Sequence, residues 1–197
     1  MEPNSLLALR WLRSTYTQVW AADTEYRQTP EGLPHVVCIV MREVFGRLPA
    51  LHLFEHEFQK ECPVDFNRSD VLIVSYAAPA ELGSFLQIGW SVPRNILDLF
   101  VEARMSANTI GDVKSIQRVK LLSTLAHYGL DSMDYVEKEE MRALILGKTS
   151  YTPEERKRIL EYCDKDVLAI IELLPFMLPE IPDLVDAIKT GDRKTGD

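Results

Sequence analysis

Two acidic residues, Asp23 and Glu25, lie two positions apart in a strand-like run of the chain. Alternate side chains leave the same face of a strand, so the two carboxylates point the same way along one row. Carboxylates held this way repel each other, and at least one has its pKa raised unless a cation lies between them. The pair is therefore a candidate metal site. The alternative is a solvated strand end, because Asp-x-Glu is a common tripeptide.

A second group lies in the late segment 161–167, which has the pattern of a helix. At about 100° per residue, Tyr162 and Asp166 share one face of this helix, whereas Asp164 points about 200° away from each of them. Two interpretations stay open: Tyr162 hydrogen-bonds a water while Asp166 ligates a cation, or the two residues form a hydrogen bond on the helix surface. In both, Asp164 is expected on the solvated face.

The first elements that must position these residues are a helix and three strands. The spacing of apolar residues predicts the helix, and turn signals separate the strands, which favours an antiparallel meander. The expected ranges are 5–15 for the helix and 18–26, 35–44 and 48–54 for the strands.

The next part of the chain predicts a parallel unit followed by helices. The continuous apolar run 71–76 is typical of a strand covered on both faces, Pro79 opens a helix to about Ile88, and 95–99 is a further short strand. Capping signals and terminal glycines indicate that the rest is helical, over 115–128, 134–146 and 153–174.

The expected fold class is α/β, with a mixed five-stranded sheet of three antiparallel strands plus two parallel strands, flanked by helices. This order of elements resembles the ribonuclease-H-like fold. No repeat or long linker divides the chain, so a single domain is expected over 1–189, followed by a polar tail over 190–197.

The composition excludes some classes of protein. The 197 residues carry 30 acidic and 22 basic side chains, a net charge of −8, which argues against binding nucleic acid mainly through Lys and Arg. Cleavage of phosphodiesters through bound cations is still allowed.

No stretch approaches the roughly 20 apolar residues of a membrane span, so a cytoplasmic protein without a membrane partner is expected. Cysteines without a ligand pattern are expected as reduced thiols: Cys38, Cys62 and Cys163.

Together, the motifs resemble the proofreading 3′-to-5′ exonuclease domains of family A DNA polymerases, within the superfamily that uses four catalytic acids. The resemblance covers nearly the whole chain. The family's strand motif Asp-x-Glu matches Asp23 and Glu25, and its late helical motif Tyr-x-x-x-Asp matches Tyr162 and Asp166. A related subgroup has a His five residues before the final Asp, where this chain has Glu161, so the resemblance selects the tyrosine subgroup.

The middle motif departs from the family pattern. A gapless match places the family's catalytic Asp on Glu81, and its Asn and aromatic residue on Ala77 and Ala80. The rival is Asp98, which matches a non-catalytic Asp of the family. Glu81 is preferred, because the first turn of a helix after the fourth strand can face the end of the first strand. The extra methylene moves the carboxylate by roughly an ångström, and Mg²⁺ tolerates little distortion.

The resemblance implies a hydrolase that removes nucleotides from single-stranded or frayed DNA 3′ ends with two divalent cations, Mg²⁺ or Mn²⁺. The expected ligands are Asp23, Glu25, Glu81 and Asp166, with Tyr162 orienting the attacking water through a hydrogen bond. In the substrate site, Tyr26 is expected to stack on a base, and four basic residues are expected to contact phosphates: Arg27, Arg94, Lys148 and Arg156.

Three functions stay open from the sequence. The first is a DNA exonuclease of the proofreading type, in DNA replication, with a polymerase domain or subunit as partner. The second is a 3′-to-5′ exoribonuclease of the RNase D type, since no feature of the sequence recognises a 2′-hydroxyl. The third is a catalytically weakened module that keeps the exonuclease fold and binds a replication partner.

Overall fold

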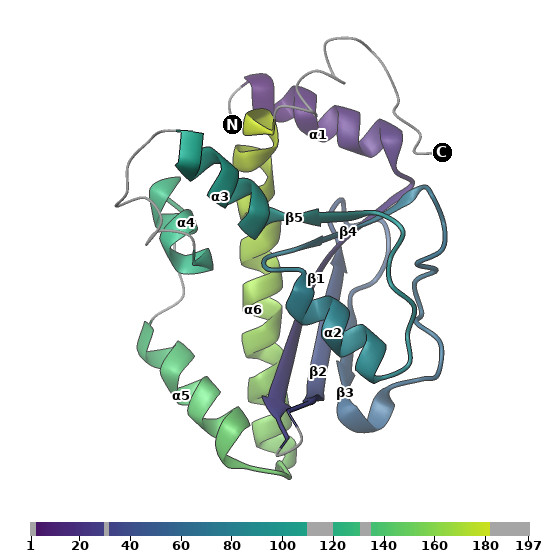
Figure 1. Cartoon of the computed structure of the whole chain (residues 1–197), viewed down its shortest axis with the longest axis vertical. Helices are drawn as coiled ribbons and strands as arrows, with labels where there is room; N and C mark the ends of the chain where they lie inside the picture. The colour runs from purple at the N-terminus through teal and green to yellow at the C-terminus, as the bar shows by residue number, and fades with distance from the viewer. Residues whose placement is uncertain (1–2, 30–31, 110–119, 131–134, 182–197) are drawn as a thin grey trace.

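In the computed structural model, which describes residues 3–29, 32–109, 120–130 and 135–181, a five-stranded mixed sheet forms the centre of the molecule (Figure 1). The strand order is β3-β2-β1-β4-β5. β1 pairs antiparallel with β2 and parallel with β4, so the meander and the parallel unit predicted from the sequence are confirmed. The strands are β1 (Gln18–Gln28), β2 (Pro34–Glu43), β3 (Leu51–Phe54), β4 (Val71–Ser75) and β5 (Ile96–Asp98).

Helices cover both faces of this sheet (Figure 1). The long α6 packs on β1 and β2 from one face, where Val19 and Ala21 of β1 are buried, and α2 covers the other face, where Trp20 and Ala22 are buried. This alternation explains why β1 is apolar on both sides at its start. The helices are α1 (Pro3–Thr15), α2 (Pro79–Gln87), α3 (Leu99–Thr109), α4 (Leu121–His127), α5 (Tyr135–Gly147) and α6 (Pro153–Met177), with short 3₁₀ turns η1 (Glu55–Glu57) and η3 (Leu178–Glu180).

The largest differences from the sequence-based expectation concern three elements. α3 was not predicted; it begins directly after β5, where the Asp98 carboxylate accepts a hydrogen bond from the Phe100 N–H at 2.9 Å. β3 begins at Leu51 rather than at residue 48, and α6 continues past Pro175 to Met177. The beginning of the helix predicted over 115–128 and the polar tail over 190–197 lie outside the described residues. Within the described ranges, no helix is both long and apolar enough to cross a bilayer.

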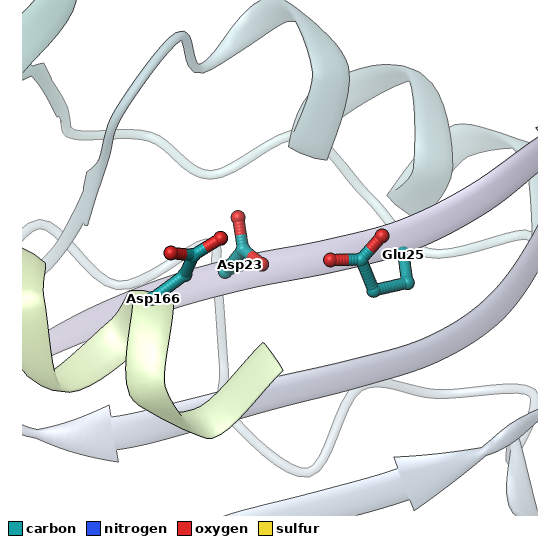
Figure 2. Close-up of side chains that lie close together, drawn as sticks. All are labelled: Asp23, Glu25 and Asp166. Carbon is teal, nitrogen blue, oxygen red and sulfur yellow. The ribbon is translucent and has the colours of Figure 1, made fainter. Parts of the chain in front are cut away.

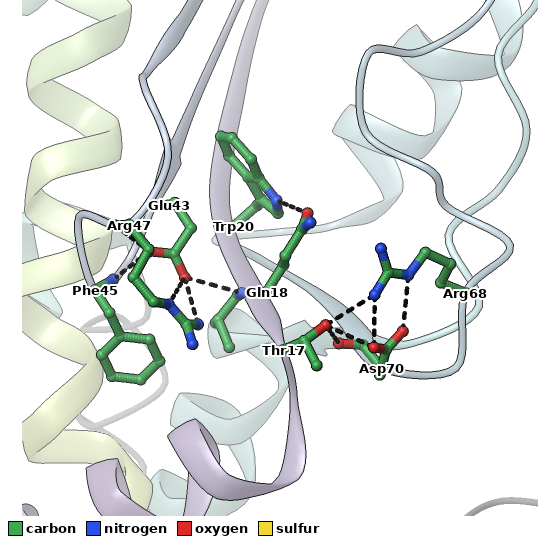
Figure 3. Close-up of polar contacts among 9 residues, drawn as sticks. Thr17, Gln18, Trp20, Glu43, Phe45, Arg47, Arg68 and Asp70 are labelled. Carbon is green, nitrogen blue, oxygen red and sulfur yellow. Dashed lines mark hydrogen bonds and ion pairs between the residues drawn. The ribbon is translucent and has the colours of Figure 1, made fainter.

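A buried carboxylate ties the beginning of β1 to the turn after β2 (Figure 3). Glu43 accepts hydrogen bonds from the backbone N–H groups of Phe45 at 3.1 Å and Arg47 at 2.9 Å, and the Arg47 guanidinium lies 2.7 Å from Glu43 Oε1. The same carboxylate lies 3.4 Å from the N–H of Val19 in β1. Burial alone would raise the pKa of Glu43, but the Arg47 side chain and these N–H groups outweigh it and lower the pKa.

A second polar cluster holds β1 to the chain before β4 (Figure 3). Thr17 Oγ1 donates to Asp70 Oδ2 at 2.6 Å, and the Arg68 guanidinium lies 2.7 Å from the same carboxylate. These groups are partly exposed, so their contribution to stability is smaller than that of the buried Glu43 cluster. Together the two clusters hold the beginning of β1 against the end of β2 and against the segment before β4.

We predict that Glu43→Ala lowers the free energy of unfolding by about 2 to 4 kcal/mol at pH 7, because it leaves buried backbone donors and the Arg47 charge without their partner. The loss should shrink in acid: a carboxylate with a lowered folded pKa stabilises the protein above its unfolded pKa and loses that effect as pH falls. Urea denaturation at several pH values measures both effects. Asp70→Ala is the exposed control, and an equal loss in the two variants would contradict the assignment.

Candidate metal centre

Three carboxylates converge between β1 and α6: Asp23 and Glu25 from the strand and Asp166 from the helix (Figure 2). One oxygen from each lies within 4.8 Å of the others. β4 pairs with β1 only as far as Ala21, so the two strand acids lie beyond the carboxyl end of β4. Here β2 carries an extra residue, since Glu25 lies opposite Cys38 and Tyr26 opposite Val36. The sequence prediction that Asp23 and Glu25 point the same way agrees with this arrangement.

The beginning of α6 determines which of its side chains face the sheet. Thr152 caps the helix by accepting from the Glu155 N–H at 3.2 Å, while the Glu155 carboxylate accepts from the Thr152 N–H at 2.9 Å. Three turns later, Tyr162 and Asp166 are both buried, one turn apart on the sheet-facing side. They therefore share a face, and they lie in the interior rather than on the helix surface.

The expectation that Asp164 is solvated is wrong. Its carboxylate is only 17% exposed and forms a bidentate pair with Arg42 of β2, at 2.5 and 2.7 Å, while His52 of β3 lies 3.1 Å away. Burial tends to raise the pKa of Asp164, but Arg42 and His52 outweigh it and lower the pKa. Asp164 points away from the carboxylate cluster, as the helical spacing predicts. The spacing could not show that β2 and β3 lie against this second face of α6 as well. Its role is to hold α6 on the sheet.

The cluster is electrostatically unfavourable without a cation. Burial and the neighbouring Asp166 raise the pKa of Asp23 to about 7, although the Cys163 thiol, which donates to Asp23 Oδ2 at 3.3 Å, partly opposes this. Burial and Asp23 raise the pKa of Glu25 well above its ordinary value, and burial raises that of Asp166 despite the nearby Lys138. The raised pKa values favour protonation of these oxygens, and a bound cation would oppose it.

Glu81 lies beside this cluster, in the first turn of α2. It is 3% exposed, and its Oε2 atom is buried with no hydrogen-bond partner within the described part of the chain. Burial, and then the proximity of Asp23, raise its pKa well above the ordinary value. A buried carboxylate oxygen without a partner is costly unless a ligand satisfies it. Its carboxylate is a hard oxygen donor of the kind that Mg²⁺ and Mn²⁺ prefer, and it lies near Asp23, although the group of oxygens within 4.8 Å of one another comes from Asp23, Glu25 and Asp166.

Asp98 is the other candidate for the acid of the middle motif, but its carboxylate is bound by backbone N–H groups. Its two oxygens accept hydrogen bonds from the N–H groups of Ala77 at 3.0 Å, Ala78 at 3.1 Å and Phe100 at 2.9 Å. Ala77 has a φ of 73°, a left-handed conformation that Ala adopts reluctantly and Asn more readily. Asp98 thus stabilises the strained turn that leads into α2 and positions Glu81. This arrangement supports Glu81 as the ligand and gives Asp98 a structural role.

A cavity of about 680 Å³ lies next to the carboxylates, between the end of β1, α4, α5 and α6. Glu25, Tyr162 and Asp166 lie in its wall, together with two of the predicted substrate residues, Tyr26 and Arg27. Their roles stay predictions, but their positions agree with them.

The other three predicted substrate residues lie elsewhere. Arg94 precedes β5 and is not part of the cavity wall, and Lys148 forms an ion pair with Glu155. The Arg156 guanidinium lies over the Phe54 ring, 5.5 Å from its centroid, beside a different cleft.

Lys138 was not among the site residues expected from the sequence. Its Nζ atom lies 3.0 Å from Asp166 Oδ2 and 5.8 Å from the centroid of the Tyr162 ring. The sequence feature that could have pointed to Lys138 is its spacing of four residues from Arg142 in a predicted helix. This spacing of basic residues is also common on solvated helix faces.

Comparison with known proteins shows the fold. No family model and no curated protein matches the chain. Among solved structures, the apo form of a nuclease superposes with a TM-score of 0.57 at 17% identity, over 96% of this chain and 84% of that one. Escherichia coli RNase D, an exoribonuclease involved in structured RNA processing, superposes with a TM-score of 0.55 at 14% identity, over 98% of this chain and 48% of that one. The chain therefore has the ribonuclease-H-like fold predicted from its sequence, and it spans about half of RNase D.

We predict that Asp23→Asn stabilises the metal-free protein at pH 8 by about 1 to 3 kcal/mol, because Asn cannot ionise. An Asp whose folded pKa is raised to about 7 favours the folded state in acid, and this contribution is lost as pH rises from about 4 to 7. The advantage of Asn should therefore shrink toward pH 5. Urea denaturation in chelator measures it, with the exposed Glu172→Gln as control. Destabilisation by Asp23→Asn at pH 8 would contradict the predicted repulsion.

Proposed function

We propose that this chain is a metal-dependent 3′-to-5′ exonuclease. The observation that carries the proposal is a set of four carboxylates beside a cavity: Asp23 and Glu25, which are partly buried, and Glu81 and Asp166, which are buried. They lie in a fold that the chain shares with nucleases. Two bound Mg²⁺ or Mn²⁺ ions would supply an activated water and stabilise the charge that develops on phosphorus. The role of these side chains is to hold the ions at the cavity wall.

Tyr162 is the residue proposed to orient the attacking water. Its ring is buried on the same helix face as Asp166, and it lies in the cavity wall. Burial, then the negative charges of Asp166 and Glu25, raise the pKa of Tyr162 above its ordinary value of 10.0. The phenol therefore keeps its proton at neutral pH and acts through a hydrogen bond rather than as a base.

The proposed substrate is a single-stranded 3′ end. The cavity volume lies within the roughly 300 to 1,000 Å³ of small-ligand sites, so it has room for a terminal nucleotide. That nucleotide must be splayed out of the stack to reach the carboxylates, so a duplex end is expected to unpair first. Tyr26, in the cavity wall, is the proposed base-stacking residue.

DNA is the substrate that the resemblance to proofreading domains favours, with a polymerase domain or subunit as the proposed partner. RNA is a second candidate, and the likeness of fold to RNase D favours it. A catalytically weakened module is the third candidate; its motivation is the Glu at position 81, but the burial of Glu81 beside Asp23 speaks for a retained ligand.

The test is cleavage of 5′-labelled single-stranded DNA and RNA of the same sequence, with Mg²⁺, Mn²⁺ or chelator. We expect a ladder of products shortened from the 3′ end, formed only with metal. Asp23→Asn and Glu81→Gln should each reduce the rate by about a hundredfold or more, because each removes a charged ligand. Asp98→Asn, if folded by circular dichroism, should retain most of the activity.

The ratio of the rate of DNA cleavage to the rate of RNA cleavage identifies the substrate class. Faster cleavage of DNA supports the proofreading type, and faster cleavage of RNA supports the RNase D type. Absence of cleavage with either metal would contradict the proposed function, and loss of activity in folded Asp98→Asn but not in Glu81→Gln would contradict the ligand assignment.

A further inference from the structure

The cavity beside the carboxylates is richer in basic residues than the rest of this acidic chain. Four of the fourteen residues in its wall are Lys or Arg, against 22 of 197 in the whole chain: Arg27, Lys120, Lys138 and Arg142. Three residues of the wall are acidic, and two of them, Glu25 and Asp166, belong to the carboxylate cluster itself. The Arg27 Nε atom is buried with no hydrogen-bond partner among the residues that the structure describes. Basic groups gathered in one cavity, with a buried donor lacking an acceptor, indicate an anionic ligand.

Two of these residues lie one turn apart on α5. Lys138 and Arg142 are four positions apart, and both lie in the cavity wall, so they share the helix face that borders the cavity. Lys138 is the inner one, beside Asp166, and its side chain is 30% exposed. Arg142 is exposed and, unlike Lys138, forms no ion pair with an acid of the cluster. The pair thus places positive charge on the cavity wall beside the cluster.

Lys138 has its counter-charge in the carboxylate cluster. Its ammonium donates to Asp166 at 3.0 and 3.4 Å and so reduces the repulsion among the acids. Divalent cations held by Asp23, Glu25 and Asp166 would place like charge near Nζ and would weaken this pairing. A lysine side chain is a flexible four-carbon stem, so the ammonium can turn toward the cavity without movement of α5. There it needs a new anionic partner.

We propose that Lys138 and Arg142 form a phosphate-binding subsite for the phosphodiesters that precede the 3′-terminal nucleotide. This inference rests on the proposed function for the identity of the strand, but its chemistry is shared by DNA and RNA because both carry the same phosphate. In the metal-free protein Lys138 neutralises Asp166; in the loaded protein it binds phosphate. Arg142 holds the next part of the strand, and Arg27 of β1 lies in the same cavity wall.

The test is binding of fluorescent oligo(dT) and oligo(U) by anisotropy, with Ca²⁺ to load the site, over a series of KCl concentrations. Lys138→Ala and Arg142→Ala should each weaken binding about three- to tenfold at low salt and reduce the slope of log Kd against log [KCl] by about 0.7 for each phosphate that is no longer neutralised. Lys138→Arg should restore the slope. Lys157→Ala is the matched control, because its side chain is 76% exposed and lies outside the cavity wall.

Calorimetric titration of Mn²⁺ separates this role from a merely structural one. If Lys138 only positions Asp166, Lys138→Ala will bind Mn²⁺ more weakly and leave the salt slope unchanged, which overturns the proposal. If Lys138 competes with cations for Asp166, the variant will bind Mn²⁺ at least as tightly as the wild type.

The two proposals fail in different ways. Wild-type slopes in both alanine variants, or no binding of either oligonucleotide by the wild type, overturn the phosphate subsite, whatever the nuclease assay shows. Reduced slopes in the alanine variants of a protein that does not cleave support the subsite and contradict the exonuclease.

Discussion

The repulsion among clustered carboxylates is the constraint on which the rest of the structure depends. Asp23, Glu25 and Asp166 present oxygens within 4.8 Å of one another, and the buried Glu81 adds a fourth acid, whose pKa the nearby Asp23 helps to raise. A protein gains no stability from such a group in the absence of a cation, because desolvation and like charge both oppose ionisation. The packing of the fold therefore holds these acids together although their proximity lowers the stability of the metal-free protein. A bound cation would reverse this effect and stabilise the folded state. Strained or repulsive groups of this kind are expected at functional sites.

Several contacts around the cluster offset this cost. Cys163 donates to Asp23, and Lys138 pairs with Asp166, so each end of the cluster has one stabilising neighbour. Farther away, Asp98 satisfies the donors of the strained turn before α2, and Asp164 joins α6 to two strands. Each of these contacts connects segments distant in sequence. The positions of the acids are therefore determined by the packing of α2 and α6 on the sheet.

Local patterns were enough to predict the strands of the sheet and the common face of Tyr162 and Asp166. Periodicity shows which side chains share one face of a helix or strand, and this was the information that these predictions needed. It does not show what lies opposite that face. For this reason Asp164 was expected in solvent although Arg42 lies against it, and Lys138 was overlooked although it contacts Asp166. α3 was missed because its beginning depends on Asp98, whose carboxylate also binds the turn after the neighbouring strand β4.

The central claim is that the carboxylate cluster is a site for divalent cations, and calorimetric titration of the wild-type protein with Mn²⁺ at pH 7 tests it most directly. Because the buried acids have raised pKa values, saturable binding should release protons, seen as heats that vary with the ionisation enthalpy of the buffer. Replacing both Asp23 and Asp166 by Asn should abolish the binding. Heats that do not saturate in the wild type, or that persist in the double variant, would contradict the claim.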